Sequence, residues 1–207
     1  KAAQLLLMTY LGSPCIYYGD ETGAKGTLNL NSEGFCRHGS NFDSMQWDRR
    51  HWNFEITMLY RSLCELRRAH KALRTGAFEL LTADDSAKVF AYARYDEEST
   101  VIALITQNPQ DLVFDLDVSR LGIADGEIFA NWITGENIAV SNGRICVPLY
   151  CEDGGAVLIH GGMQSGRFRR RFELFCGPEG GIRYHGKKEL RIPSANQISE
   201  RKENLKM

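Results

Sequence analysis

The stretch Pro14-Cys-Ile-Tyr-Tyr-Gly-Asp-Glu21 has the pattern of a short buried strand that ends abruptly. Proline has no N–H to donate, so Pro14 suits the first position of a strand. The unbroken apolar and aromatic run over residues 15–18 is typical of a strand covered on both faces. Asp20 and Glu21 follow at once, at the carboxyl end, where an α/β barrel builds its active site. A core strand followed by a solvated acidic turn accounts for the same residues.

The flanking residues place this strand in a β/α unit. Residues 2–11 are apolar and rich in helix formers, and Gly12 ends the predicted helix. A second helix is predicted over residues 53–71, because Asn53 is a good N-cap and apolar residues recur at spacings of three and four. A helix, a tight turn and a buried strand form one unit of a parallel sheet. One unit cannot make a sheet, so we expect the other strands to come from residues upstream of Lys1.

From residue 76 onward the apolar period changes from helical spacing to alternation. Seven short apolar segments separated by turn residues predict an antiparallel β-sandwich. Asn142-Gly143 is a strong hairpin signal between two apolar runs. The predicted strands cover residues 78–81, 89–93, 101–105, 112–116, 127–132, 144–149 and 156–159.

Composition argues against some classes of function. The 207 residues include 25 Lys and Arg against 26 Asp and Glu, a balance that argues against nucleic-acid binding by the whole chain. The charge is uneven, because residues 164–207 hold eleven basic and five acidic residues. The basic, aromatic run at residues 167–175 has the character of a single-strand nucleic-acid binder. A β-ribbon, a frayed tail or a stretch translated out of frame explains it better.

Six cysteines occur without a CxxC pair, which argues against a zinc site and favours a reducing compartment. No apolar run reaches the roughly 18 residues of a transmembrane helix, and we expect no signal peptide. We therefore expect a cytoplasmic protein that makes no membrane contact, and the sequence indicates no cofactor or metal.

Between the two predicted helices, residues 22–52 form an irregular stretch with several glycine and aromatic residues. Loops of this length are usually functional or disordered, and the aromatic residues argue against disorder. A covering loop without a ligand role is the alternative.

Several motifs occur in a telling order: residues 12–23, then Cys36-Arg37, then Met45-Gln-Trp-Asp48, then residues 63–76. In this order they resemble the C-terminal part of alpha-amylase superfamily glycoside hydrolases. The closest likeness is to the neopullulanase, cyclomaltodextrinase and maltogenic amylase branch. Two later motifs, Ala91-Tyr-Ala-Arg94 and Gly154-Gly-Ala-Val-Leu158, fit the sandwich that ends these proteins.

The resemblance implies an α+β fragment. Residues 1–75 correspond to the last β/α unit of a (β/α)8 TIM barrel with its cleft loop, and residues 76–162 correspond to an all-β antiparallel sandwich. Residues 163–207 form a basic tail without a counterpart in the family. The missing N-terminal barrel is then a required partner, and a homodimer is a further expectation because this branch commonly dimerises.

The implied activity is retaining hydrolysis of α-glucosidic bonds in cyclodextrin, pullulan, starch or maltooligosaccharides. That chemistry needs two carboxyl groups about 5 Å apart. In the family they follow the fourth and fifth barrel strands, and a third carboxylate follows the seventh. All three positions precede Lys1, so this chain is expected to carry no catalytic residue. The alternative is a non-catalytic sandwich module that binds carbohydrate or protein, and the upstream sequence discriminates between the two.

Substrate contacts are expected nonetheless. In the family an acidic residue four positions before an arginine holds sugar hydroxyls, and Glu33 and Arg37 keep that spacing, with Glu where Asp is usual. A carboxylate accepts and a guanidinium donates, which suits paired hydroxyls. Seven residues, 38–44, separate Arg37 from the next motif, more than the family norm. This insertion affects where Arg37 lies.

Three further residues are candidates for substrate binding. Trp47 either offers a flat apolar face to a sugar ring or anchors the loop, and the anchor is slightly favoured. Asp20 and Glu21 lie at the strand exit. They are not assigned as acid and nucleophile, because adjacent residues on a turn rarely face one bond from both sides.

Overall fold

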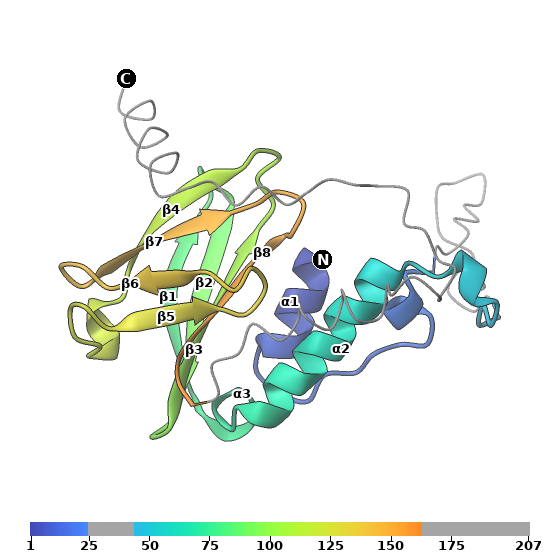
Figure 1. Ribbon diagram of the computed structural model, residues 1–207, viewed down its shortest axis with the longest axis horizontal. Helices are drawn as coiled ribbons and strands as arrows, with labels where there is room; N and C mark the ends of the chain where they lie inside the picture. Colours follow the sequence, from blue (N-terminus) through green and yellow to red (C-terminus); the bar gives the residue numbers. More distant parts are fainter. Residues whose placement is uncertain (25–43, 163–207) are drawn as a thin grey trace, which may run out of the picture.

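The computed structural model describes residues 1–24 and 44–162, which form three layers (Figure 1). Helices α1 (Ala2–Thr9), α2 (Phe54–Ala69) and α3 (Ala72–Thr75) make up the helical layer. Three short 3₁₀ segments are η1 (Asp20–Thr22), η2 (Arg49–His51) and η3 (Ser119–Leu121). The strands are β1 (Ala77–Asp84), β2 (Val89–Tyr95), β3 (Ser99–Thr106), β4 (Leu112–Asp117), β5 (Ile128–Asn131), β6 (Asn137–Ala139), β7 (Arg144–Leu149) and β8 (Gly155–Gly161).

The strands form two antiparallel sheets, as the alternating pattern predicts. The larger sheet has the order β1-β2-β3-β8-β5-β6, and the smaller sheet pairs β4 with β7. In Figure 1 the helices lie on one side of the larger sheet, away from β4 and β7. The larger sheet is therefore the middle layer.

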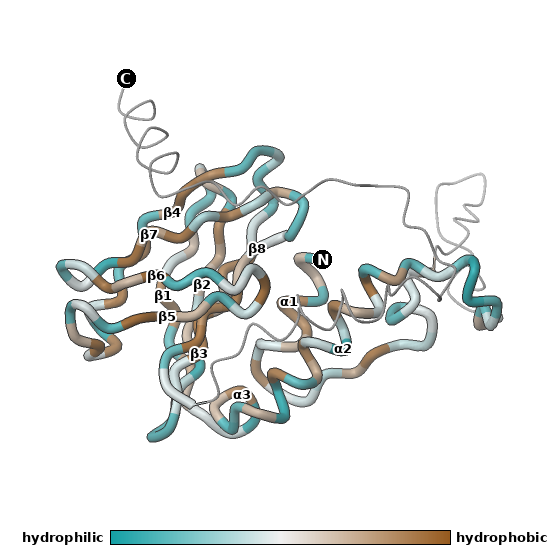
Figure 2. Tube along the Cα trace, in the orientation of Figure 1, coloured by the Kyte–Doolittle hydropathy of each residue, from teal (hydrophilic) through white to brown (hydrophobic). Residues whose placement is uncertain are grey.

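Strand β3 shows why this middle layer is buried on both faces. Ile102 and Leu104 belong to the apolar cluster shared with β4 and β7. Val101, Ala103 and Ile105 belong to the cluster shared with α1 and α2. Successive side chains of a strand point to opposite faces, so alternate residues of β3 contact the two outer layers. Figure 2 shows the apolar run along β3 that results.

Helix α2 matches the helix that the sequence predicts. The Asn53 side chain caps its first turn by accepting the Ile56 N–H at 3.2 Å. Leu63 and Leu66 are fully buried on the predicted apolar face. Ser62 is also buried, and its hydroxyl is satisfied there because its Oγ accepts a hydrogen bond from Trp132 Nε1 at 2.7 Å. This bond links α2 to the segment that follows β5.

We expect Trp132→Phe to lower the free energy of unfolding by about 1–2 kcal/mol, since it removes the donor to the buried Ser62 hydroxyl. Ser62→Ala should cost a similar amount. The double variant should cost less than the sum, because each change removes the same hydrogen bond. Urea denaturation of the four proteins measures this coupling, and strictly additive losses would contradict it.

Arg94 on β2 also joins the helical layer to the sheet. Its side chain is only 2% exposed. Its guanidinium donates to the backbone carbonyl oxygens of Tyr10, Leu73, Gly76 and Ala77 at 3.1, 3.2, 3.1 and 3.3 Å. These carbonyls follow α1, end α3 and begin β1, so one side chain holds three chain segments together.

The stretch at residues 14–18 differs from its prediction. It forms no paired strand, and Cys15, Tyr17 and Tyr18 are exposed. A buried parallel strand needs hydrogen-bonded neighbours on both sides, and no described strand lies beside this stretch. The prediction of a buried strand is therefore wrong for this chain by itself. The predicted glycine break is present, because Gly19 adopts a left-handed conformation with φ of 96°.

The predicted turn at Asn142-Gly143 is present, with φ of 52° and 67°. The Ser141 N–H donates to the Arg144 carbonyl at 2.9 Å, and the Arg144 N–H donates back at 3.1 Å. The expected hairpin ladder stops at this bridge, because β6 pairs with β5 and β7 pairs with β4. The turn thus carries the chain from the larger sheet to the smaller one.

The two predicted domains meet in one apolar cluster, which contains residues of α1, α2, β2, β3 and β8. The division between residues 75 and 76 stays a prediction, and the predicted tail at 163–207 lies outside the described residues. Within the described parts of the chain, no helix has the length and apolar character needed to cross a membrane.

Candidate functional site

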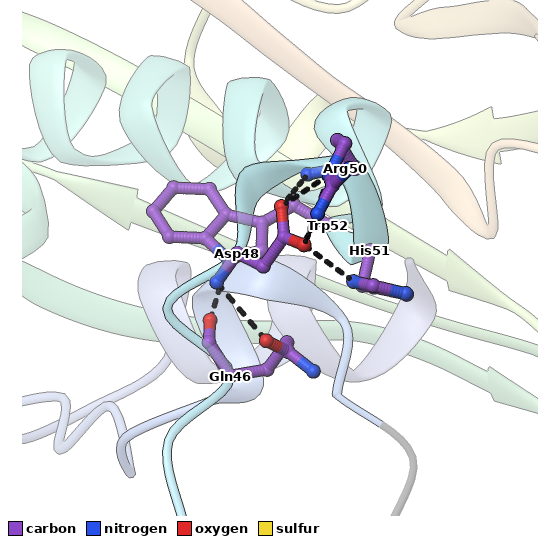
Figure 3. A network of polar contacts seen from close by, with 5 residues as sticks. All are labelled: Gln46, Asp48, Arg50, His51 and Trp52. Atoms are coloured by element: carbon purple, nitrogen blue, oxygen red, sulfur yellow. Dashed lines mark hydrogen bonds and ion pairs between the residues drawn. The ribbon is translucent and has the colours of Figure 1, made fainter.

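The segment that enters α2, residues 45–52, gathers polar and aromatic side chains around Asp48 (Figure 3). Arg50 Nε donates to the two carboxylate oxygens of Asp48 at 2.9 and 3.0 Å, and Arg50 Nη2 donates at 2.6 Å. The Arg50 N–H also donates to Asp48, at 3.0 Å. His51 Nδ1 lies 3.4 Å from the same carboxylate. The hydrogen bonds from Arg50 hold the pKa of Asp48 below its usual value.

Trp52 anchors this segment. Its Nε1 donates to the Gln46 carbonyl oxygen at 2.7 Å, and its ring lies 6.3 Å from that of Phe54. The Arg49 guanidinium lies over the ring, 5.6 Å from its centroid. Trp47, for which the sequence slightly favoured the anchoring role, is instead 79% exposed. Its indole is therefore open to solvent, in the residue that precedes Asp48.

Asp20 and Glu21 lie in η1, which is fastened to the start of α2. The Asn53 N–H donates to the carbonyl oxygen of Thr22 at 2.8 Å. Glu21 Oε2 accepts the Gly19 N–H at 2.9 Å, so this carboxylate closes the turn. Asp20 is exposed. The turn therefore meets the segment that enters α2 through backbone contacts.

The remaining two candidates, Glu33 and Arg37, lie outside the described residues. Sequence reasoning missed Arg50 and His51 as partners of Asp48. The available signal was the run Asp48-Arg-Arg-His51, in which an acid is followed at once by three basic residues. Within residues 1–24 and 44–162, no group of three or more His, Cys, Asp or Glu side chains could hold a metal ion.

The arrangement has a definite chemical character. An exposed indole offers an apolar face, and the carboxylate and guanidinium of the same segment accept and donate hydrogen bonds. Such a set suits a ligand that carries both C–H faces and hydroxyl groups. It holds one carboxylate of fixed position rather than an opposed pair, so it contains no acid and nucleophile arrangement.

Comparisons with known proteins agree on one class of protein. No protein-family model matches the chain. A cyclomaltodextrinase from a Bacillus species is 37% identical over 52% of the chain and 18% of its own length. A cyclomaltodextrinase from Geobacillus thermopakistaniensis is 33% identical over 72% of the chain and 23% of its own length. The solved structure of a cyclomaltodextrinase, 28% identical, covers 77% of the chain and 25% of its own length with a TM-score of 0.59.

The chain is thus homologous to one portion of the enzymes of the alpha-amylase family of glycoside hydrolases. More narrowly, its homologues include cyclomaltodextrinases, a neopullulanase and a maltogenic alpha-amylase. These confirm the branch that the sequence motifs indicate. The chain spans about a fifth of the length of these curated relatives.

Proposed function

We propose that this chain is part of an enzyme that hydrolyses α-glucans and that it supplies substrate contacts rather than the catalytic carboxylates. Homology to cyclomaltodextrinases supports the substrate class. The catalytic groups that the family resemblance implies would lie upstream of Lys1. We accordingly expect no hydrolysis of cyclodextrin, pullulan or starch by the 207-residue chain alone.

The observation that carries the proposal is the exposed indole of Trp47, in the same short segment as the Asp48–Arg50 ion pair. A glucose ring has apolar C–H faces that stack on an aromatic ring, and its hydroxyls match a fixed acceptor and donor pair. Asp20 and the pair Glu33 and Arg37 remain proposed contacts to further hydroxyls. Glu21 has a structural part as well, since it closes its own turn.

An upstream barrel is the partner we propose for the chain. The exposed large apolar side chains concentrate between residues 6 and 18, where they sit on and just after α1. Burying such side chains stabilises a complex by about 25 cal/mol for each Å² of apolar surface removed from water. Neighbouring barrel strands would also supply the hydrogen bonds that residues 14–18 do not make to a described strand. The exposed apolar side chains on and after α1 are Leu6, Tyr10, Leu11, Tyr17 and Tyr18, each 37–51% exposed.

Trp47→Ala should weaken maltoheptaose binding by the 207-residue chain by about tenfold or more, a loss near 1.4 kcal/mol. The reason is the removal of the stacking face, while the exposed position leaves the fold unaffected. Isothermal titration calorimetry measures the dissociation constants of the parent and the variant.

Leu80→Ala is the matched control, because Leu80 is also an exposed large apolar residue, on β1. It should bind as the parent does. Equal affinity of the Trp47→Ala variant and the parent, or a loss of the same size in Leu80→Ala, would overturn this role for Trp47.

A further inference from the structure

A groove of about 420 Å³ opens where β6, the turn at residues 140–143 and β7 meet β4. This volume falls in the range of small-molecule sites, roughly 300–1,000 Å³. In Figure 1, β6 and β7 lie at the opposite end of the molecule from the segment that enters α2. The groove is therefore separate from the site around Trp47. Side chains that line it include Asp115, Ile138, Ser141, Asn142, Arg144 and Cys146.

The charged residues that line the groove are Arg144 and Asp115, and Asp117 lies beside Arg144 outside the lining. Arg144 Nε lies 3.1 Å from Asp115 Oδ1, and Arg144 Nη1 lies 3.5 Å from Asp117 Oδ2. Arg144 Nη2 also donates to the Asp115 carbonyl oxygen at 3.1 Å. The guanidinium is thus already matched by carboxylates, and the charges that line the groove, Asp115 and Arg144, balance each other. An anionic ligand would have to compete with Asp115 for Arg144, whereas a neutral ligand that both donates and accepts hydrogen bonds is favoured.

The backbone of the turn at residues 140–143 is held by a side chain from outside the turn. Asp125 accepts the N–H groups of Asn142 and Gly143 at 2.8 and 2.9 Å. The turn geometry consequently does not depend on the Asn142 amide, which with the Ser141 hydroxyl lines the groove. Ile138 also borders the groove, but it is a buried residue of the apolar cluster between the sheets.

We propose that this groove is a second, non-catalytic binding site for a neutral oligosaccharide. Carboxylate, guanidinium, amide and hydroxyl groups bind vicinal sugar hydroxyls, and Asp115, Arg144, Asn142 and Ser141 supply them here. A bound metal ion is a poorer occupant, since no described cluster of His, Cys, Asp and Glu is suited to hold one. The choice of an α-glucan as the oligosaccharide rests on the proposed function. A groove far from the Trp47 segment would hold a glucan chain to the protein by a second contact.

The test uses the ¹⁵N-labelled 207-residue chain titrated with maltoheptaose and followed by NMR. We expect the amide resonances of residues 138–146 to shift with saturation. The variant Ser141→Ala/Asn142→Gly should bind at the groove at least tenfold more weakly. Glycine accepts the φ of 52° that Asn142 adopts, so this variant keeps the turn.

Lys88→Gly is the matched control, because Lys88 is the other described non-glycine residue with a positive φ, 53°, and it lies in the β1–β2 turn. It should leave the groove affinity unchanged. Groove resonances that stay fixed while those near Trp47 shift would overturn this inference and leave the proposed function standing. Groove shifts without shifts near Trp47 would support the groove and contradict the proposed role of Trp47. Unchanged groove affinity in the double variant would also overturn the inference.

Discussion

Arg94→Met is expected to lower the free energy of unfolding by about 3–5 kcal/mol. The methionine fills much of the space and brings no charge, so no buried cation is left unpaired. The loss comes from the four carbonyl oxygens that Arg94 now satisfies. A buried acceptor without a donor costs about 1–3 kcal/mol. The free energy of unfolding of Arg94→Lys should fall between those of the parent and Arg94→Met. One ammonium group cannot reach all four carbonyls that the planar guanidinium reaches.

Urea denaturation followed by tryptophan fluorescence measures the effect. The matched control is Arg120→Met. The Arg120 side chain is 73% exposed, and its Nη1 lies 3.7 Å from Glu79 Oε1, which is a long distance for an ion pair. Exposed pairs contribute about 0–1 kcal/mol, so this control should unfold close to the parent. An Arg94→Met protein that unfolds at the same urea concentration as the control would contradict the bridging role of Arg94.

Gly155→Ala is expected to abolish folding or to lower the free energy of unfolding by more than about 4 kcal/mol. Gly155 begins β8 with φ of 146°, a conformation that residues with a Cβ rarely adopt. A Cβ there would lie 2.0 Å from the Leu104 carbonyl oxygen, a backbone atom of the neighbouring strand. Gly155 pairs with Ile105 in the central β3–β8 ladder, so relief of the clash would break that ladder.

Gly126→Ala separates the clash from the cost of the backbone conformation. Gly126 also has a positive φ, 89°, but no atom lies within 4 Å of the position of an added Cβ. Its cost should be about 1–2 kcal/mol, from the left-handed conformation alone. Circular dichroism during thermal unfolding compares the two variants. Equal melting temperatures would show that the approach of β8 to β3 at Gly155 is not close.

Local pattern was enough to predict α2 and most strands. The cap at Asn53 and the apolar face of α2 are encoded within a few turns of helix, and the unbroken apolar run over residues 101–105 of β3 indicates burial on both faces. Pairing partners were not predictable in the same way. The turn at Asn142-Gly143 has the local geometry of a hairpin, yet its strands enter different sheets because each is held by a strand distant in sequence.

Burial of residues 14–18 could not be judged from their apolar character, because burial of a strand depends on neighbours along the sheet. Arg94 is a second case. A charged residue in a strand normally indicates an exposed position, but here carbonyls from three segments satisfy it. Neither effect has a local signature in the sequence.

The candidate site was predictable in part. The Met45-Gln-Trp-Asp48 motif located the segment, but not the pairing of Asp48 with Arg50 or the exchange of anchoring from Trp47 to Trp52. Those depend on the direction in which each side chain leaves the backbone before, within and after η2. The groove beside β7 had no sequence signal, since its lining comes from β4, β6, β7 and the turn between the last two.

The central claim is that this chain belongs to an α-glucan hydrolase whose catalytic groups lie upstream. Reading the coding DNA upstream of Lys1 tests it most directly. We expect the reading frame to continue through seven further β/α units, with an Asp after the fourth strand, a Glu after the fifth and an Asp after the seventh, as the family resemblance implies. A start codon next to Lys1 with no such barrel before it would contradict the claim and favour a non-catalytic binding module.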